Sequence, residues 1–228
     1  MRKVIVNLAT GRYLVGQARL RETLMRTGYD GDMLFYTSEG DMGAEPHHEN
    51  PYAFKIQGFR RAMEAGYDLI MWLDASVTAL KPVQPVFDII ANQGFVMQQA
   101  GWWVGTWAND FSLNYFKITR EEAMRMEMYG NAGFLGLNVH NPTAMEFLNR
   151  WEASAKDGAF KGAWTNLNNS ESMDRECRGH RHDMTCGSII ANQLGMNKFY
   201  LRGDEWLEYN APGAHPRNET IIFQAQGV

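Results

Sequence analysis

The stretch Y-D-L-I-M-W-L-D-A-S at residues 67–76 decides the fold of this chain. Its apolar run, Leu69–Leu73, is too short for a helix and lacks the alternation of a half-exposed strand, so it predicts a strand covered on both faces of a parallel sheet. The run ends at the carboxylate of Asp74. Because ligands of open α/β sheets bind beyond the carboxyl ends of the strands, Asp74, Ala75 and Ser76 are candidate site residues.

The composition describes a folded globular domain. The chain has 228 residues, of which 45% are hydrophobic and 12% aromatic, and this predicts a single domain over residues 1–228. A formal net charge of -4 makes nucleic acid a poor partner. No apolar stretch is long enough for a transmembrane segment, and the first expected strand begins at Val4, so we expect a cytoplasmic protein.

The opening residues form a strand, a turn and a helix, but they match no common phosphate-binding motif. Residues 4–8 predict the strand, and Gly11 and Gly16 after it have the spacing of the P-loop glycines. The lysine and hydroxyl residue that a P-loop needs are replaced by Gln17 and Ala18. No G-x-G-x-x-G follows the strand either, which removes the main support for a dinucleotide dehydrogenase.

Helix-start signals predict three further helices, over residues 50–65, 119–129 and 141–155. A strand is predicted over residues 131–138. The polar residues 156–176 carry no clear period and predict a mobile loop or lid. The alternation of strands and helices predicts an α/β fold.

Four segments together resemble the motifs of GT-A fold glycosyltransferases. Residues 67–76 resemble the strand with its D-x-D motif, and N-A-G-F-L-G-L at 131–137 resembles the N-A-G-(apolar)-G segment that lines the sugar pocket. H-R-H-D at 180–183 is similar to the H-R-x-D-Q segment of bacterial sugar transferases. Residues 4–11 resemble the first strand and turn, which contact the nucleotide.

This resemblance implies a fold and an activity. The fold is an α/β, GT-A-like mixed and mostly parallel sheet flanked by helices on both faces. Its nucleotide-binding half would be about residues 1–100, and its acceptor and sugar half about residues 101–228. The implied activity is that of a hexosyltransferase-like enzyme, which moves a sugar from a nucleotide-sugar donor to a glycan or another small acceptor.

The resemblance also assigns roles to residues. Asp74 would hold the nucleotide and its metal, and Asp183 would contact the donor sugar or act as a base. Lys55 and Arg181 are the basic candidates for the diphosphate. The other implied donor-binding residues are Leu8, Ala9, Thr10, Gly11, Ala75, Ser76, Asn131, Ala132, Gly133 and His182.

Two positions depart from the family's motifs. The two carboxylates of D-x-D hold Mn²⁺ or Mg²⁺ in the family, but Ser76 replaces the second one here, and a hydroxyl is a weaker ligand for a hard cation. Met184 stands where the family has a glutamine. His215 is the candidate for a further metal ligand from the last loops, although Gln224 equally fits that place.

Two alternatives remain open at this point. The departures at Ser76 and Met184 also fit a catalytically inactive GT-A-like domain that binds a nucleotide sugar or a glycan. A zinc-stabilised interaction protein is the other alternative, because zinc ligand types recur in a C-x2-H-x-H-x3-C pattern, although its spacing matches no common zinc module. That pattern is formed by Cys177, His180, His182 and Cys186.

Two residue groups have both a structural and a functional interpretation. Trp102, Trp103 and Trp107 would either pack in a core or form a stacking surface for a sugar acceptor. His47 and its neighbours lie in a polar loop, and a solvated loop is the favoured interpretation there.

Overall fold

A central sheet of the computed structural model is organised around β3 (Leu69–Leu73). The structure describes residues 1–202, 206–209, 215–217 and 219–226, without the side chains of Asn131 and Ala132. The strand order is β2-β1-β3-β6-β5, with β2 at Asp32–Tyr36, β1 at Lys3–Leu8, β6 at Glu127–Asn138 and β5 at Phe95–Trp103. β1 pairs in parallel with β2 and β3, whereas β6 runs antiparallel to both β3 and β5. The predicted mixed, mostly parallel sheet is therefore confirmed.

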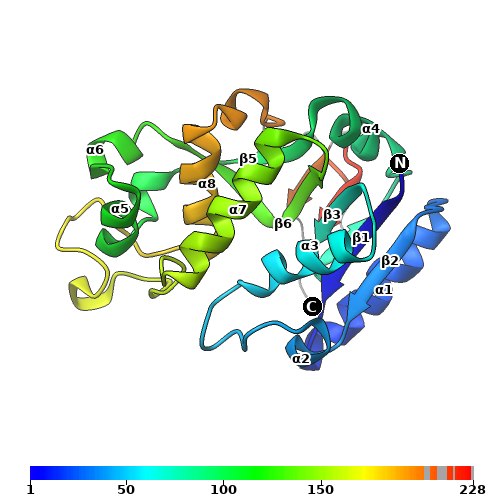
Figure 1. Cartoon of the computed structure of the whole chain (residues 1–228), viewed down its shortest axis with the longest axis horizontal. Coiled ribbons are helices and arrows are strands. Elements are labelled where there is room, and N and C mark those ends of the chain that lie inside the picture. The colour runs from blue at the N-terminus through cyan, green and yellow to red at the C-terminus, as the bar shows by residue number, and fades with distance from the viewer. Residues whose placement is uncertain (203–205, 210–214, 218, 227–228) are drawn as a thin grey trace.

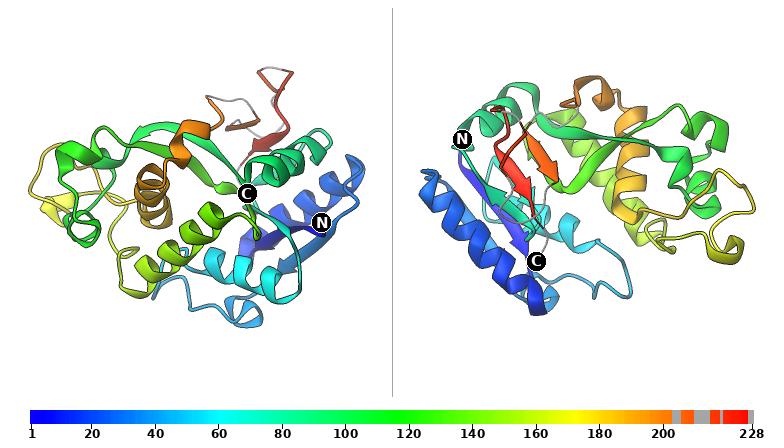
Figure 2. Two further views of the ribbon diagram at one scale, coloured as in Figure 1. Left: turned by 45° about the horizontal axis from the view of Figure 1, so that its top comes forward. Right: turned by 180° about the vertical axis from the view of Figure 1, so that it is seen from behind.

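Helices cover both faces of this sheet (Figure 1). On one face α3 (Phe54–Glu64), α7 (Pro142–Lys156) and α8 (His182–Gln193) pack into one hydrophobic cluster. On the other face α1 (Leu14–Arg26) and α4 (Gln84–Gln93) pack into a second cluster. The second cluster also includes a small sheet of order β4-β8-β7, which lies over the large sheet in the view from behind (Figure 2). Its strands are β4 (Val77–Ala79), β8 (Phe223–Ala225) and β7 (Leu207–Tyr209).

The side chains of β3 explain its unbroken apolar sequence. Ile70 and Trp72 belong to the cluster under α3, and Leu69, Met71 and Leu73 belong to the cluster under α1 and α4. All five are buried. Because alternate side chains of a strand point to opposite faces, a strand between two helical layers needs an apolar residue at every position.

A third hydrophobic cluster lies at the end of the molecule away from β1 and β2 (Figure 1). Its helices are α5 (Asp110–Phe116) and α6 (Arg120–Ala123), and Ile189 of α8 joins them to the main body. The remaining elements are short: η1 (Gly11–Tyr13), α2 (Glu39–Met42), η2 (Val104–Thr106), η3 (Leu167–Asn169) and η4 (Met196–Phe199). No described helix is both long and apolar enough to cross a membrane.

The helix predicted from residue 50 begins later, at Phe54. Asn50 does not cap it, since its side-chain oxygen accepts no hydrogen bond from a described residue, while its buried amide donates to Glu45 Oε2 at 2.8 Å and to the carbonyl of Ala155 at 3.2 Å. Tyr52 has φ +64° between the two positions. The tertiary contact with α7 has overridden the local capping signal.

The helix predicted over residues 119–129 is wrong in its second half. Thr119 and Glu122 form a capping box, but the helix ends at Ala123 and β6 begins at Glu127. Tyr129 pairs with Gln99 of β5 and is fully buried. Sheet pairing and burial therefore decide this segment, and a cap alone gives only the start of a helix.

The polar segment 156–176 is fastened by hydrogen bonds rather than being without structure. The side-chain oxygen of Asn166 accepts from the backbone N–H groups of Glu171 at 2.9 Å and Ser172 at 3.2 Å. Its amide donates to the carbonyls of Ser172 at 2.9 Å and Cys177 at 3.1 Å. The side chain of Asn166 thus supplies hydrogen bonds to backbone groups that have no partner in a regular helix or strand here.

Candidate functional site

A cavity of about 380 Å³ opens beyond the carboxyl ends of β1 and β3. The position follows from topology, because parallel neighbours bring their last residues to the same edge of a sheet. The lining residues come from the ends of these strands and from the segments before α3: Leu8, Ala9, Thr10, Tyr13, Glu39, His47, Tyr52, Phe54, Asp74, Ala75 and Ser76.

The structure brings together six of the residues proposed from the sequence. Leu8 ends β1 and is followed by Ala9 and Thr10, and Asp74, Ala75 and Ser76 follow β3. Gly11, Lys55, Gly133, Arg181, His182, Asp183 and His215 are not among the lining residues. The side chains of Asn131 and Ala132 lie outside the described residues.

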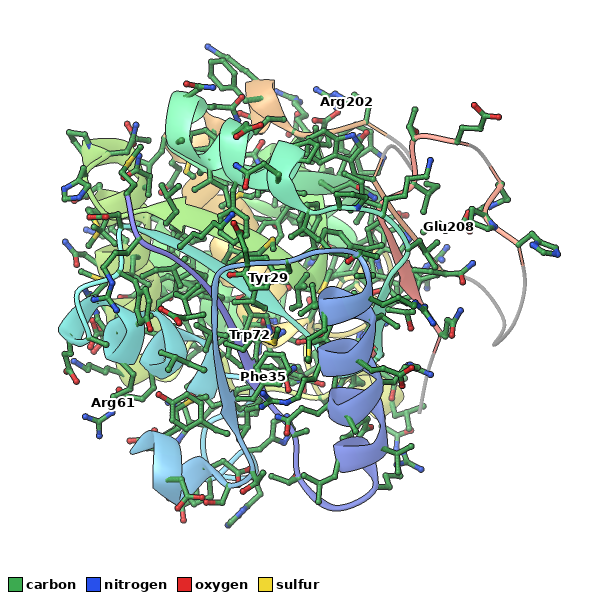
Figure 3. The ribbon with its side chains drawn as sticks, turned by 90° about the vertical axis from the view of Figure 1, so that its right-hand side faces the viewer. Tyr29, Phe35, Arg61, Trp72, Arg202 and Glu208 are labelled. Carbon is green, nitrogen blue, oxygen red and sulfur yellow. The ribbon has the colours of Figure 1, made fainter. Side chains whose placement is uncertain are left out.

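Asp74 is held by its neighbours through one carboxylate oxygen. Oδ1 accepts a hydrogen bond from Trp72 Nε1 at 2.7 Å and lies 3.5 Å from Lys55 Nζ. Trp72 supplies this bond because it lies two residues earlier on the same face of β3, in the interior of the molecule (Figure 3). The side chain of Asp74 remains 38% exposed, so it is accessible to a ligand in the cavity.

Gly133 allows β6 to pass close to Asp74. The backbone N–H of Asp74 donates to the Gly133 carbonyl at 3.2 Å. A Cβ at Gly133 would lie 3.0 Å from Asp74 Oδ2 and 3.1 Å from Asp74 Cβ. A side chain at this position would force Asp74 to shift by a few tenths of an ångström, so glycine favours the close approach.

Lys55 joins the two candidate catalytic carboxylates from behind the cavity. It is buried on α3, and its Nζ lies 3.1 Å from Asp183 Oδ2 in addition to its contact with Asp74. Burial acts to lower the pKa of Lys55, but the charges of Asp183 and Asp74 outweigh it and hold the pKa above its ordinary value. The ammonium is thus a permanent charge between two carboxylates.

Asp183 is the more deeply buried of the two carboxylates. Burial raises its pKa to about 6, and the neighbouring Lys55 partly opposes this rise. Its Oδ2 makes no hydrogen bond of regular geometry to any described residue, so the 3.1 Å approach of Lys55 is its compensation by charge. Such a buried oxygen is costly unless the ammonium stays in place.

His182 is fixed in position, and its surroundings favour the neutral form of its imidazole. Its Nδ1 lies 2.8 Å from the Phe160 carbonyl, and its own backbone has φ +47°. Burial lowers the pKa of the imidazole. The ring lies 5.5 Å from the Tyr52 ring and 5.4 Å from the Trp164 ring, between centroids. His182 therefore acts in the aromatic wall beside the cavity and does not present a charge to it.

Five lining residues were not found from the sequence: Tyr13, Glu39, His47, Tyr52 and Phe54. His47 belongs to the loop that the sequence indicated as simply solvated, and its ring instead packs edge-on against Tyr52 with centroids 4.6 Å apart. Two aromatic residues within three positions, just before a helix, were the available signal for Tyr52 and Phe54.

The cavity offers part of a cation site. Asp74 and Ser76 both line it, but no three His, Cys, Asp or Glu side chains in the described part of the chain are arranged to hold a metal ion. His215 is exposed and lies outside the lining, and Gln224 is buried and donates to Glu208 Oε1 at 2.9 Å. A divalent cation would therefore need further oxygen ligands from a substrate bound in the cavity.

The Cys and His residues of the zinc alternative are already bonded to backbone carbonyls. His180 Nε2 and Cys186 Sγ both contact the Ala159 carbonyl, at 3.0 and 3.2 Å. Cys177 Sγ donates to the Ala108 carbonyl at 3.4 Å. Because these described side chains form no metal-binding group, the zinc alternative loses its support.

Comparison with known proteins places this fold. No family model matches the chain, and no curated protein matches its sequence. Among solved structures, a glycosyltransferase involved in glycosylating the major capsid of PBCV-1 is similar, with 10% identity, a TM-score of 0.55 and coverage of 99% of this chain and 92% of that one. Mouse xyloside xylosyltransferase 1 is also similar, with 11% identity, a TM-score of 0.52 and coverage of 99% of this chain and 97% of that one.

The bifunctional glycosyltransferase WbbM is also similar, with 11% identity and a TM-score of 0.52. The match covers 98% of this chain but 45% of WbbM, so the chain spans less than half the length of that protein. Together with the sheet order and its two helical layers, these similarities show that the chain has the GT-A-like fold of glycosyltransferases.

Proposed function

We propose that this protein is a glycosyltransferase that moves a sugar from a nucleotide-sugar donor to a carbohydrate acceptor. One observation carries the proposal: in a GT-A-like fold, the cavity at the ends of β1 and β3 is lined by six of the residues proposed from the sequence for the donor, with Asp74 among them. Small side chains at Ala9 and Ala75 leave room for a ligand at this edge.

The nucleotide would occupy the cavity between the strand ends and the aromatic residues of η1 and around the start of α3. The rings of Tyr13, Tyr52 and Phe54 line one part of it and supply faces for the base and ribose. The charged end of the donor would lie near Asp74 and Ser76. This arrangement would place the phosphates at the strand ends, where ligands of open α/β sheets bind.

A cation would be part of the bound donor. The lining includes two carboxylates, Asp74 and Glu39, and no lysine or arginine, so a diphosphate needs a counter-charge there. Asp74 and Ser76 would hold Mn²⁺ or Mg²⁺ together with phosphate oxygens. The cation would stabilise the negative charge on the leaving diphosphate. We leave His215 out of this ligand set because its side chain is outside the lining.

In the transfer itself, an acceptor hydroxyl oxygen forms the new bond to the anomeric carbon while the bond from that carbon to the diphosphate oxygen breaks. The diphosphate leaves with the electron pair, and a base or solvent takes the hydroxyl proton. Lys55 and Asp183 would support this step by positioning: the buried pair holds Asp74 Oδ1 and leaves Oδ2 for the ligand. Fixed orientation of the charge avoids reorganisation when the diphosphate forms.

One observation favours a second function, a domain that binds nucleotide sugar without turnover. Oδ1 of Asp74 is already engaged by Trp72 and Lys55, and Ser76 is not a carboxylate. If the remaining oxygen holds a cation too weakly, the donor would bind and stay intact.

A two-part experiment tests both functions. A panel of nucleotide sugars, with and without Mn²⁺, is screened for thermal stabilisation, and the bound donor is then assayed for release of nucleoside diphosphate. At a hundredfold excess over Kd we expect about 2.7 kcal/mol of stabilisation, which is roughly 5 to 10 °C at this size. Stabilisation with diphosphate release supports the transferase, and stabilisation without it supports the binding domain. No shift with any donor would refute both.

A further inference from the structure

Four side chains form a tryptophan–arginine cluster beside the cavity: Trp102, Trp107, Trp164 and Arg181. The guanidinium carbon of Arg181 lies 3.7 Å from the ring centroid of Trp107, 4.4 Å from that of Trp164 and 5.9 Å from that of Trp102. Trp102 is 44% exposed and Trp164 is 50% exposed. Two exposed indoles and one partly buried indole around one cation are an unusual use of large apolar area, because such rings normally bury most of it.

Arg181 has no carboxylate partner among the described residues. Its Nη1 donates to the carbonyl of Trp164 at 2.7 Å, and its Nε is buried without a hydrogen bond to any described group. Two other partly buried arginines differ in this respect: Arg60 pairs with Glu152, and Arg120 pairs with Asp110 at 2.8 Å. Partial burial of a guanidinium without a nearby anion leaves its charge available to a ligand.

The backbone holds the cluster in a fixed arrangement. The N–H of Arg181 donates to the Trp107 carbonyl at 3.2 Å, and the hydroxyl of Thr185 donates to the same carbonyl. Gly179 has φ +153°, and a Cβ there would collide with the Trp164 carbonyl oxygen. Three separate segments are therefore locked against one another, which lowers the entropy lost when a ligand is bound.

Aromatic rings connect this cluster to the cavity. The Tyr52 ring lines the cavity, and its centroid lies 6.2 Å from that of Trp164. His182 contacts both rings. A molecule bound on the indoles would thus lie at the border of the proposed donor site, where an acceptor must lie to be glycosylated.

We infer that the tryptophan–arginine cluster is the acceptor subsite and that it takes a carbohydrate bearing an anionic group, a carboxylate or a phosphate. This inference rests on the proposed glycosyltransferase function. Indole faces suit the C–H face of a sugar ring, and the planar guanidinium suits an oxyanion through paired hydrogen bonds. The same chemistry would come from a uronic acid or from a sugar phosphate, and the test separates the two.

The test measures binding without any donor, by calorimetry, for trigalacturonate, maltotriose and glucose 6-phosphate. We expect one anionic sugar to bind roughly tenfold or more tightly than neutral maltotriose, because only the anionic sugar can make charge-assisted hydrogen bonds to the guanidinium. Trigalacturonate preferred over glucose 6-phosphate identifies a uronic acid, and the reverse identifies a phosphate. Equal binding of the neutral and anionic sugars would overturn the inference.

Variants separate the cluster from the rest of the surface. Arg181→Gln should remove the preference for the anionic sugar, and Trp102→Ala should weaken every sugar that binds. Trp103→Ala is the matched control, since Trp103 is 45% exposed but makes no described ring contact with the cluster, and it should change nothing. If Arg181→Gln does not fold, Trp102→Ala against Trp103→Ala still decides, and equal effects of these two changes would overturn the inference.

Donor binding by thermal shift keeps the two proposals distinguishable. A donor that stabilises the protein while no carbohydrate binds would overturn the acceptor subsite and leave the proposed function standing. Carbohydrate binding without any donor binding would overturn both the proposed function and the assignment as an acceptor subsite. Arg181→Gln should leave the donor-induced shift unchanged, because Arg181 is not part of the cavity lining.

Discussion

The end of β3 and the start of α8 place the same residue type against the same ammonium in two different environments. Asp74 is 38% exposed and lines a cavity, whereas Asp183 is 3% exposed and has only Lys55 to compensate Oδ2. The two carboxylates therefore have different roles. The accessible carboxylate can meet a ligand, and the buried one fixes the lysine that orients it.

Lys55→Met leaves both carboxylates, Asp74 and Asp183, without the cation that they share. We expect a loss of about 3 kcal/mol or more in the free energy of unfolding, as for other buried pairs that lose one partner. Urea denaturation measures it. Arg61→Met on the same helix is the control, since it removes only an exposed pair with Glu64 and a hydrogen bond to the Met42 carbonyl, which should together contribute about 1 to 2 kcal/mol. Equal losses in the free energy of unfolding of both variants would contradict a particular role of Lys55 between the two carboxylates.

Asp74→Asn acts on the accessible side of the comparison. We expect roughly a hundredfold loss of diphosphate release, equivalent to about 2.7 kcal/mol, because a charge that faces the reaction is removed. The melting temperature should move by only a few degrees, since an asparagine oxygen still accepts from Trp72 Nε1. An unfolded variant would mean that Asp74 is a structural residue.

Asp183→Asn replaces the buried carboxylate, and its effect should be seen in the pH dependence of the free energy of unfolding. The pKa of Asp183 rises from an ordinary 3.8 to about 6 on folding. Its contribution to stability is therefore fully present below pH 3.8 and is lost as the pH rises through about 6. An asparagine at this position does not titrate and has no such loss. The stability of the variant relative to the native chain should therefore rise by about 2 to 3 kcal/mol between about pH 4 and 7.

Urea titrations of both proteins across this range provide the measurement. A constant difference between them at all pH values would show that Asp183 titrates normally. The comparison of the two proteins removes the contributions of the other carboxylates, which are common to both.

Ser76→Asp adds a second carboxylate next to the accessible Asp74 in the cavity. Tighter Mn²⁺ binding is expected, by roughly tenfold, because a hard anionic oxygen is added beside Asp74. The fold should tolerate it, since Ser76 lines the cavity and is not fully buried. Calorimetric titration with Mn²⁺ measures the change, and unchanged affinity in a folded variant would place the cation elsewhere.

The fold was largely predictable because its main strand is unambiguous. An apolar residue at each position from Leu69 to Leu73 fits only a strand between two layers, and the structure confirms it. The errors came where long-range contacts decide the outcome. Asn50 bonds to α7 instead of capping α3, and Tyr129 pairs with β5 instead of continuing a helix.

The candidate site was predictable to the extent that it lies at strand ends. Thr10 and Asp74 follow neighbouring parallel strands, so their proximity follows from the topology. Tyr52 was missed because its place depends on a left-handed backbone conformation and on contacts with Trp164 and His182, which lie far along the chain from it. No local pattern contains that information.

The bond from Trp72 to Asp74 makes the indole N–H a natural reporter for nuclear magnetic resonance. Trp72 is 1% exposed and its Nε1 donates to the oxygen of Asp74 that Lys55 also approaches. Its proton should exchange slowly with solvent, and its resonance should move when the charge at Asp74 changes. Occupancy of the cavity can thus be followed from the core of the protein, by a group that never contacts the ligand.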